Sequence, residues 1–218
     1  MSNIVHEVDI PFQKATFGMG CFWANDSLFG ATQGVLRTRV GYSGGTTPNA
    51  TYKSIGDHTE VIELDFDPKS ITYEQLLELF WKNHEYGLTT KIKKQYASMI
   101  LYHNNVQKEI AETSLMHERS NHTVELCTEI KPASIFYPAE DYHQKYRLQR
   151  HPQLCKALGL TPKLLQKSHV AARLNGYVAG VGSEEALVKD LATFNLTQKD
   201  VEYVKMHFKQ NKESGLYC

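Results

Sequence analysis

A hydrophobic pattern in residues 14–103 is the feature that most constrains the fold of this chain. Three stretches alternate along one face with the period of two that is typical of β-strands: residues 14–20, 35–42 and 59–67. A fourth stretch, residues 95–103, is apolar on both faces, as expected of a central strand. Helices are predicted between them, at residues 22–33 and 71–83. The order β-α-β-β-α-β predicts a two-layer α+β sandwich with a ferredoxin-like core.

That order also predicts which side chains meet. In such a core the first two strands run one way and the last two run the other way. Cys21 and Tyr42 end the first two predicted strands, and Glu60 and Tyr96 begin the last two. We therefore expect these four residues to gather at one end of the sheet.

The second half of the chain has a weaker pattern. Residues 123–130 are predicted as a strand and the glycine-rich residues 175–182 as a loop. Helices are expected at residues 106–119, 184–193 and 198–211, the last two after the N-cap residues Ser183 and Thr197.

The length of 218 residues fits one main domain with an appendage. We divide the chain into a flexible leader, a catalytic core, and a helical C-terminal extension that ends in a mobile tail carrying Cys218. The boundaries are residues 1–13, 14–150 and 151–218.

Composition and charge argue against several classes of partner. Lys plus Arg and Asp plus Glu each count 24, and this balance indicates no nucleic-acid partner. No run of about 18 apolar residues occurs, so we expect no membrane span and no membrane partner. The first residues lack the pattern of a signal peptide. Four scattered cysteines indicate a reducing setting rather than a disulfide framework. We therefore expect a cytoplasmic monomer.

Cys21 lies in the stretch FGMGCFWAND, where the first predicted strand turns into the first helix. Free backbone N–H groups and the helix dipole at that position lower the pKa of a thiol. Gly18 and Gly20 give a substrate close access to the sulfur. The alternative is an inert core cysteine. Phe22 and Trp23 could form an apolar cage for a ligand or could belong to the core.

Glu60 lies on the apolar face of its predicted strand, in register with Ile62 and Leu64. Burial there disfavours the carboxylate, raises the pKa and makes Glu60 a candidate general acid. The alternative is a solvated glutamate at a frayed strand end. Tyr42 and Tyr96 could donate hydrogen bonds to a substrate oxygen, although tyrosines in strands usually serve packing.

A thiolate, a neutral acid and aromatic walls suit an electrophile with an apolar arm and a polar oxygen. Methionine sulfoxide fits this description, because its methyl group is apolar, its oxygen accepts hydrogen bonds and its sulfur can be attacked by a thiolate. No metal site is apparent, since histidines such as His103 and His143 are scattered and no Cys-x-x-Cys motif occurs.

Six ordered motifs across residues 14–146 resemble peptide methionine sulfoxide reductase A. They are GCFW, VGYSGG, HTEVIELDFDP, FW..H, QYAS and FYPAEDYHQKY. The resemblance implies a two-layer α+β core and thiol-dependent reduction of the S epimer of methionine sulfoxide, free or within proteins. It also implies repair of oxidised proteins under oxidative stress, with thioredoxin as the reductant and no other cofactor.

The resemblance further implies a role for each candidate residue. Cys21 would attack the sulfoxide and become a sulfenic acid, and Glu60 would protonate the departing oxygen. The remaining contacts would be Tyr42 and Tyr96 to the oxygen, and Phe22 and Trp23 around the substrate methyl group. A second cysteine would then form a disulfide that thioredoxin reduces.

We predict that this second cysteine is Cys218. The segment KESGLYC follows a predicted helix, and Gly215 adds conformational freedom. Seven extended residues span up to roughly 25 Å, enough to reach back across the end of the sheet. Cys127 and Cys155 lie in a predicted strand and a predicted helix, with less freedom to approach. Cys218 would attack the sulfenic acid of Cys21.

The chain departs from the family pattern in three places, the last of which bears on substrate binding. The family usually continues Gly-Ala-Glu after the tryptophan, where this chain has Ala24, Asn25 and Asp26. The segment after His84, EYGLTTKIKK, is shorter than usual, and Lys91 replaces an aspartate that helps to anchor the substrate. The change around Lys91 leaves open an inactive relative that binds oxidised methionine. A second alternative, independent of these departures, is a general thiol peroxidase or oxidoreductase that uses Cys21.

Overall fold

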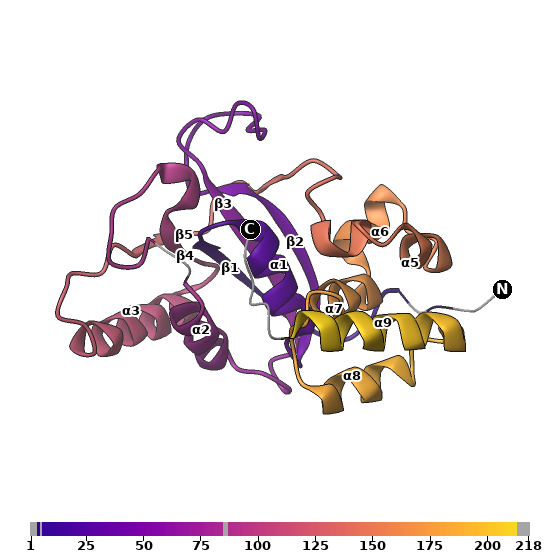
Figure 1. The fold of residues 1–218 in the computed structure, drawn as a ribbon. Helices are drawn as coiled ribbons and strands as arrows, with labels where there is room; N and C mark the ends of the chain where they lie inside the picture. Colours follow the sequence, from indigo (N-terminus) through magenta and orange to yellow (C-terminus); the bar gives the residue numbers. More distant parts are fainter. Residues whose placement is uncertain (1–3, 5, 85–86, 213–218) are drawn as a thin grey trace.

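The computed structural model describes residues 4, 6–84 and 87–212, and Figure 1 shows its elements. The strands are β1 (Gln13–Met19), β2 (Val35–Ser43), β3 (Thr59–Phe66), β4 (Ser98–Tyr102), β5 (Glu129–Pro132) and β6 (Tyr137–Pro138). The first helices are α1 (Phe22–Ala31), α2 (Tyr73–Lys82), the short 3₁₀ helix η1 (Lys94–Tyr96) and α3 (Asn105–Ser120). The later helices are α4 (Tyr146–Gln149), α5 (Pro152–Ala157), α6 (Pro162–Lys167), α7 (His169–Tyr177), α8 (Glu184–Leu191) and α9 (Gln198–Asn211).

The strands form one sheet of mixed direction in an α+β fold. Its order is β5-β4-β1-β3-β2-β6, and all neighbours are antiparallel except β4 and β5. Met19 at the end of β1 pairs with Ser98 at the start of β4. Tyr42 near the end of β2 pairs with Glu60 near the start of β3. The ends of β1 and β2 and the starts of β3 and β4 therefore lie at the same end of the sheet.

The main core lies between the sheet and helices α1, α2 and α3. Ile62, Leu64 and Phe66 of β3 point into this core, as their alternation predicts. Helix α2 begins with a capping box in which Thr72 and Gln75 satisfy each other's backbone N–H groups. Its apolar side chains then pack toward β1, and α2 and α3 lie side by side over one end of the sheet (Figure 1).

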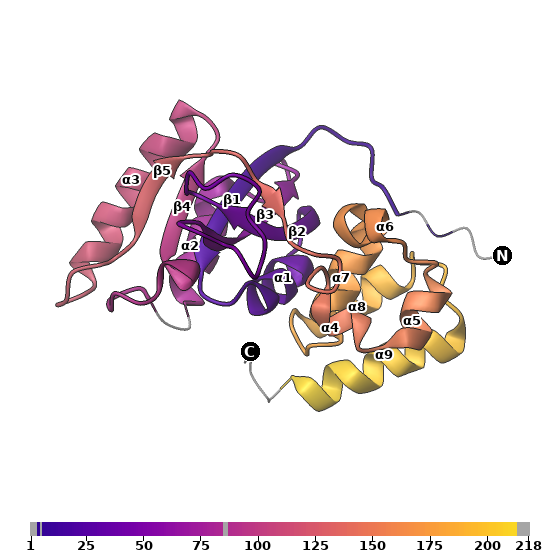
Figure 2. The same ribbon diagram turned by 90° about the horizontal axis from the view of Figure 1, so that it is seen from above.

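A second core joins helices α4, α5, α7, α8 and α9, and these helices and α6 gather on the opposite side of the molecule from α2 and α3 (Figures 1 and 2). Helix α7 packs directly on α1, and Gly176 makes this close approach possible. A Cβ atom at Gly176 would stand 2.5 Å from the carbonyl oxygen of Ser27 and 2.5 Å from the Cβ of Ala31. Helix α1 is therefore buried between the sheet on one side and α7 on the other.

The other face of the sheet carries a charged ladder. The ammonium of Lys14 on β1 lies 2.9 Å from both Glu63 and Asp65 on β3, and Arg37 and Arg39 on β2 pair with the same two acids. Glu63 and Asp65, the charged residues of β3, therefore have ion-pair partners on both neighbouring strands, β1 and β2. The alternation of β3 therefore separates an apolar face from an ionic one.

The predicted strand at residues 95–103 begins later than expected. Only Ser98–Tyr102 is β4, and Tyr96 lies in η1 rather than at the start of the strand. The N–H of Tyr96 donates to the carbonyl of Lys93 at 2.9 Å and closes a turn. Strand β1 has no residue left to pair there, because it ends at Met19 and Gly20 then turns at a φ of 89°.

Two predictions for the second half are also corrected. The predicted strand at residues 123–130 is observed only from Glu129, because that residue is the first to lie beside β4, opposite Met99. The predicted loop at residues 175–182 begins inside helix α7. The glycine signal misled there, because Gly176 serves helix packing rather than a turn. The predicted helices after Ser183 and Thr197 are confirmed, and both side chains cap them.

Among the residues that the structure describes, none of the helices has the length and apolar character needed to cross a membrane.

Candidate active site

Cys21 occupies the junction that the sequence predicts. It is the N-cap residue of α1, two residues after the end of β1, and is half-buried. Its extended backbone (φ −62°, ψ 121°) directs the chain from strand into helix. The sulfur is therefore carried at the positive end of the α1 dipole, where a thiolate is stabilised.

Glu60 lies beside this junction and is 2% exposed. One carboxyl oxygen accepts from the backbone N–H of Phe22 at 3.3 Å, and the other accepts from the Gln95 amide at 2.7 Å. Burial raises the pKa of Glu60 to about 7, and the two hydrogen bonds oppose that rise without cancelling it. The carboxyl can therefore hold a proton near neutral pH. It lies beside the nucleophile, because the N–H group that it contacts belongs to Phe22, the residue after Cys21.

Tyr42 is the cross-strand partner of Glu60 and is fully buried. Its hydroxyl donates to Glu140 at 2.9 Å. Burial, and then the hydrogen bond to Glu140 and the negative charge of that carboxylate, raise the pKa of Tyr42 far above its ordinary value. Tyr42 therefore stays protonated at every pH at which a folded protein is normally assayed, and Glu140 fixes the direction of its hydroxyl.

Tyr96 lies at the same end of the sheet, as the last residue of η1. The Thr59 hydroxyl donates to the carbonyl of Lys94 at 2.8 Å and ties η1 to the start of β3. Gln95, the residue before Tyr96, holds Glu60. The half-buried Tyr96 thus lies next to a direct contact of Glu60, although it does not belong to a strand.

Half-buried Trp23 forms an aromatic wall beside Cys21 together with His143 and Tyr146. Its ring stacks on Tyr146 with centroids 3.8 Å apart and planes 6° apart, and its indole N–H donates to Nδ1 of His143 at 3.0 Å. Because Nδ1 accepts this bond, the neutral His143 ring carries its proton on Nε2. Phe22 is buried beneath the wall, with its ring 5.1 Å from that of His143.

Sequence reasoning missed four side chains that the structure brings into this site. They are Gln95, Glu140, His143 and Tyr146. All four lie in motifs that carry the family resemblance, QYAS and FYPAEDYHQKY. A dense aromatic and polar segment is itself a signal, but its composition does not tell which side chains face the site.

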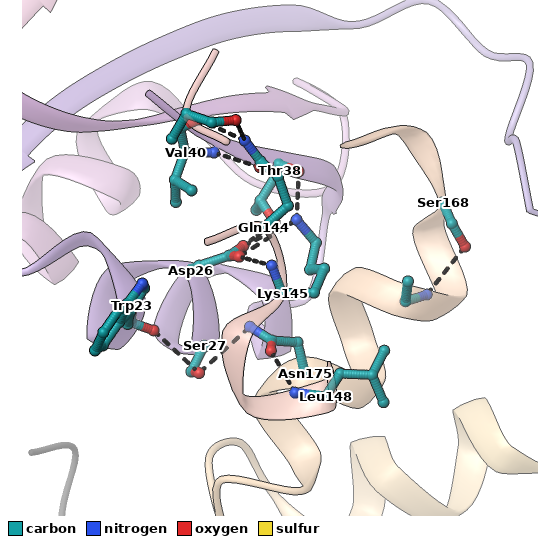
Figure 3. A network of polar contacts seen from close by, with 12 residues as sticks. Trp23, Asp26, Ser27, Thr38, Val40, Gln144, Lys145, Leu148, Ser168 and Asn175 are labelled. Carbon is teal, nitrogen blue, oxygen red and sulfur yellow. Dashed lines mark hydrogen bonds and ion pairs between the residues drawn. The ribbon is translucent and has the colours of Figure 1, made fainter. Parts of the chain in front are cut away.

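The departures from the family pattern lie in different environments. Asp26 is fully buried in the first turns of α1, where it accepts hydrogen bonds from Thr38 and Lys145 (Figure 3). Lys91 is exposed, on the segment that leads into η1. The short segment after His84 includes residues 85 and 86, which lie outside the described residues.

The remaining cysteines are Cys127, Cys155 and Cys218. Cys127 and Cys155 are free and half-buried, and the Cys155 thiol donates to the carbonyl of Leu148 at 3.4 Å. Cys218, the predicted partner of Cys21, lies outside the described residues. Within the described part of the chain, no group of three or more histidine, cysteine or acidic side chains is arranged to hold a metal ion.

Comparisons with known proteins agree on one family. Residues 13–174 match the family model described as "Peptide methionine sulfoxide reductase", and residues 159–207 match "Selenoprotein methionine sulfoxide reductase A, helical domain". A Drosophila melanogaster protein named "Peptide methionine sulfoxide reductase" is 54% identical over 215 residues, which are 98% of this chain and 87% of that protein.

Two solved structures are similar in fold. Methionine sulfoxide reductase A of Corynebacterium diphtheriae aligns with a TM-score of 0.56 and 30% identity over 66% of this chain and 77% of that chain. Mxr1 from Saccharomyces cerevisiae in its reduced form aligns with a TM-score of 0.58 and 26% identity over 69% of this chain and 91% of that chain.

Proposed function

The chain belongs to the peptide methionine sulfoxide reductase family, and from that premise we propose how its site reduces methionine sulfoxide. It is an oxidoreductase that acts on methionine sulfoxide. The observation that carries the proposal is the buried carboxyl of Glu60, which contacts the backbone beside Cys21 and has a pKa of about 7. A neutral acid next to a nucleophilic sulfur is what the reaction requires.

The thiolate of Cys21 attacks the sulfoxide sulfur while Glu60 delivers a proton to the sulfoxide oxygen. The attack joins the two sulfurs and leaves the oxygen protonated. The oxygen then passes to Cys21 as the substrate S–O bond and the bond between the two sulfurs break, so Cys21 becomes a sulfenic acid and methionine leaves as a thioether. Tyr96 and Tyr42 assist by donating hydrogen bonds to the oxygen, and for this the Tyr42 hydroxyl turns its single proton from Glu140 to the substrate. The cysteine sulfur is oxidised by two electrons and the substrate sulfur is reduced by two.

Only one sulfur configuration suits this arrangement. Trp23 and Phe22 hold the methyl group, and Glu60 with the tyrosine hydroxyls holds the oxygen, so one face of the sulfur is presented to Cys21. We expect reduction of the S epimer, whether free or within a protein. The biological role that follows is repair of oxidised proteins.

The test is turnover of the two separated methionine sulfoxide epimers with thioredoxin or dithiothreitol as reductant. Reduction of the S epimer alone is the expected result. Comparable rates on both epimers would contradict the arrangement, and binding without turnover would favour an inactive relative. Efficient reduction of hydroperoxides in the absence of sulfoxide turnover would instead indicate a general thiol peroxidase.

Regeneration of Cys21 requires a second thiol, and we assign that role to Cys218. Its thiol would attack the sulfenic acid, release water and leave a disulfide that thioredoxin opens by exchange. The assignment is supported by the half-buried positions of Cys127 and Cys155 and by the bond of Cys155 to Leu148.

The Cys218→Ser variant should give one fast turnover per enzyme and then stop with thioredoxin. Dithiothreitol should largely restore its steady-state rate, because a small dithiol can reduce the sulfenic acid directly. Normal cycling of the variant with thioredoxin, or peptide mapping of a bond from Cys21 to Cys155 or Cys127, would contradict the assignment.

We also propose a finer description of the fold, the domain boundaries and the working form of the protein. The order β4-β1-β3-β2 with antiparallel neighbours supports a ferredoxin-like core. We keep residues 14–150 as the catalytic core and residues 151–218 as the helical extension, with a cytoplasmic monomer as the working form. Light scattering and fractionation of cells test the last two statements.

A further inference from the structure

The segment His143–Tyr146 has side chains of the aromatic wall at its two ends and two anchoring side chains between them. His143 and Tyr146 contact Trp23, as described above. Gln144 and Lys145 instead turn toward β2 and α1 and are fully buried (Figure 3). The two anchors therefore decide where the two wall residues stand.

Gln144 is bound to strand β2 like an extra strand partner. Its amide nitrogen donates to the carbonyl of Val40 at 2.8 Å, and its amide oxygen accepts from the N–H of Val40 at 3.0 Å. These two bonds fix the position of Gln144 along β2. They do not by themselves fix the direction in which the chain leaves Gln144.

Lys145 supplies that direction. Its backbone has a φ of 52°, in the left-handed region that non-glycine residues seldom adopt. Its N–H donates to Asp26 at 2.9 Å, and its ammonium lies 2.6 Å from the carbonyl of Thr38 and 3.1 Å from Asp26. The Thr38 hydroxyl donates to the same carboxylate at 2.5 Å. An unfavourable backbone conformation is thus held by a buried ion pair whose groups are hydrogen-bonded.

The pair joins the wall residues to the helix that carries Cys21. Asp26 lies on α1, one turn after Trp23, and Lys145 immediately precedes Tyr146, the residue that stacks on Trp23. A buried ammonium and a buried carboxylate are each costly alone, so neither can move without the other. The pair also gives a structural reason for Asp26, a position at which the chain departs from the family pattern.

We propose that Lys145, through its buried contact with Asp26, is a positioning residue that holds Tyr146 and His143 against Trp23 and so shapes the methyl-binding wall. Lys145 itself touches no reacting atom. This inference rests on the proposed function, because the wall matters only if it receives the substrate methyl group.

The test removes both charges together, so that no uncompensated charge is left in the interior. The variant is Asp26→Asn with Lys145→Met. A Trp81→Phe background leaves Trp23 as the reporter, since the chain has two tryptophans. The wall should loosen, so the KM for methionine S-sulfoxide should rise about tenfold while kcat with dithiothreitol stays within about twofold. The fluorescence emission of Trp23 should shift as its stack on Tyr146 opens.

A matched control removes an ion pair that lies away from the wall, with Arg173 buried and Asp190 partly exposed. Arg173 and Asp190 are 2.6 Å apart between α7 and α8. The variant Arg173→Met with Asp190→Asn should lower the melting temperature without changing KM or Trp23 emission. If this control raises KM equally, the effect of Lys145 is general destabilisation and the proposal fails.

The proposal also fails if the folded Asp26→Asn/Lys145→Met variant keeps the parental KM and Trp23 emission, or if only its kcat falls. Should that variant not fold, Thr38→Val removes only the hydroxyl bond to Asp26, leaves both buried charges in place, and must still move both readouts in the same direction. A parent that fails to reduce methionine sulfoxide would overturn the proposed function, whereas Trp23 emission would still test the positioning.

Discussion

Replacement of Glu60 by glutamine tests the chemistry most directly. Glutamine preserves the shape of the side chain and can keep a contact with the Phe22 N–H or with Gln95, but it cannot release a proton. We expect the single-turnover reduction of methionine S-sulfoxide to slow by about 10²- to 10⁴-fold, the usual contribution of a positioned acid.

The structure also sets the pH dependence. The rise in the pKa of Glu60 from 4.5 to about 7 corresponds to about 3 kcal/mol, since one unit of pKa is about 1.36 kcal/mol. Below neutrality the acid is mostly protonated, and above it the proton donor is lost. The parent rate should therefore fall about tenfold for each pH unit above 7 once Cys21 is ionised, and the Glu60→Gln rate should lack this falling limb.

Stability should change in the same pH window. The folded state binds the Glu60 proton more tightly than the unfolded state, so the parent loses stability as pH rises from about 4.5 to about 7 and loses no more from this group above that range. The loss amounts to about 3 kcal/mol. The Glu60→Gln variant should not show it when urea unfolding is compared at pH 5 and pH 8.

The stopped-flow rates test whether the buried carboxyl of Glu60 supplies the proton. A Glu60→Gln rate within threefold of the parent would show that the proton comes from another group. A parent rate that stays level between pH 7 and pH 9 would show that Glu60 is ionised in the working enzyme. Either result would refute the argument from burial.

Two further predictions concern helix α1, which begins after Cys21 and packs against Gly176 of α7. Cys21→Ser should abolish sulfoxide reduction, because an alcohol is far too weakly acidic to supply the nucleophile, and residual turnover above a few per cent would move the chemistry to another cysteine. Gly176→Ala should destabilise the protein by about 1–3 kcal/mol, since overpacking against α1 outweighs the roughly 1 kcal/mol that alanine gains in a helix. In a thermal melt this corresponds to a fall of roughly 2–12 °C, and an unchanged or higher melting temperature would show that α7 can move away from α1.

The first half of the fold could be predicted from local pattern alone. Alternation along β3 placed Glu60 with Ile62 and Leu64 on the apolar face, and the structure has it buried there. The junction at Cys21 was predicted because a strand pattern stops and a helix begins at that residue. Such features depend on neighbours within a few positions, where sequence periodicity and backbone geometry are directly linked.

The details of the site depended on which distant segments meet. Tyr96 is turned out of the strand because β1 has already ended beside it. The hydroxyl of Tyr42 is directed by Glu140, which is 98 positions away, and Glu60 is held by Gln95. Pattern along one segment carries no information about such partners.

The sequence by itself determined the kind of elements, the buried face of each strand and the family to which the motifs belong. Only the tertiary structure decided that α1 is buried on both sides, that Gly176 is a packing glycine, and that Lys145 is an interior charge paired with Asp26. The physical reason is that secondary structure arises from short-range backbone and hydrophobic periodicity. The environment of a polar side chain arises instead from contacts that exist only after remote segments have packed.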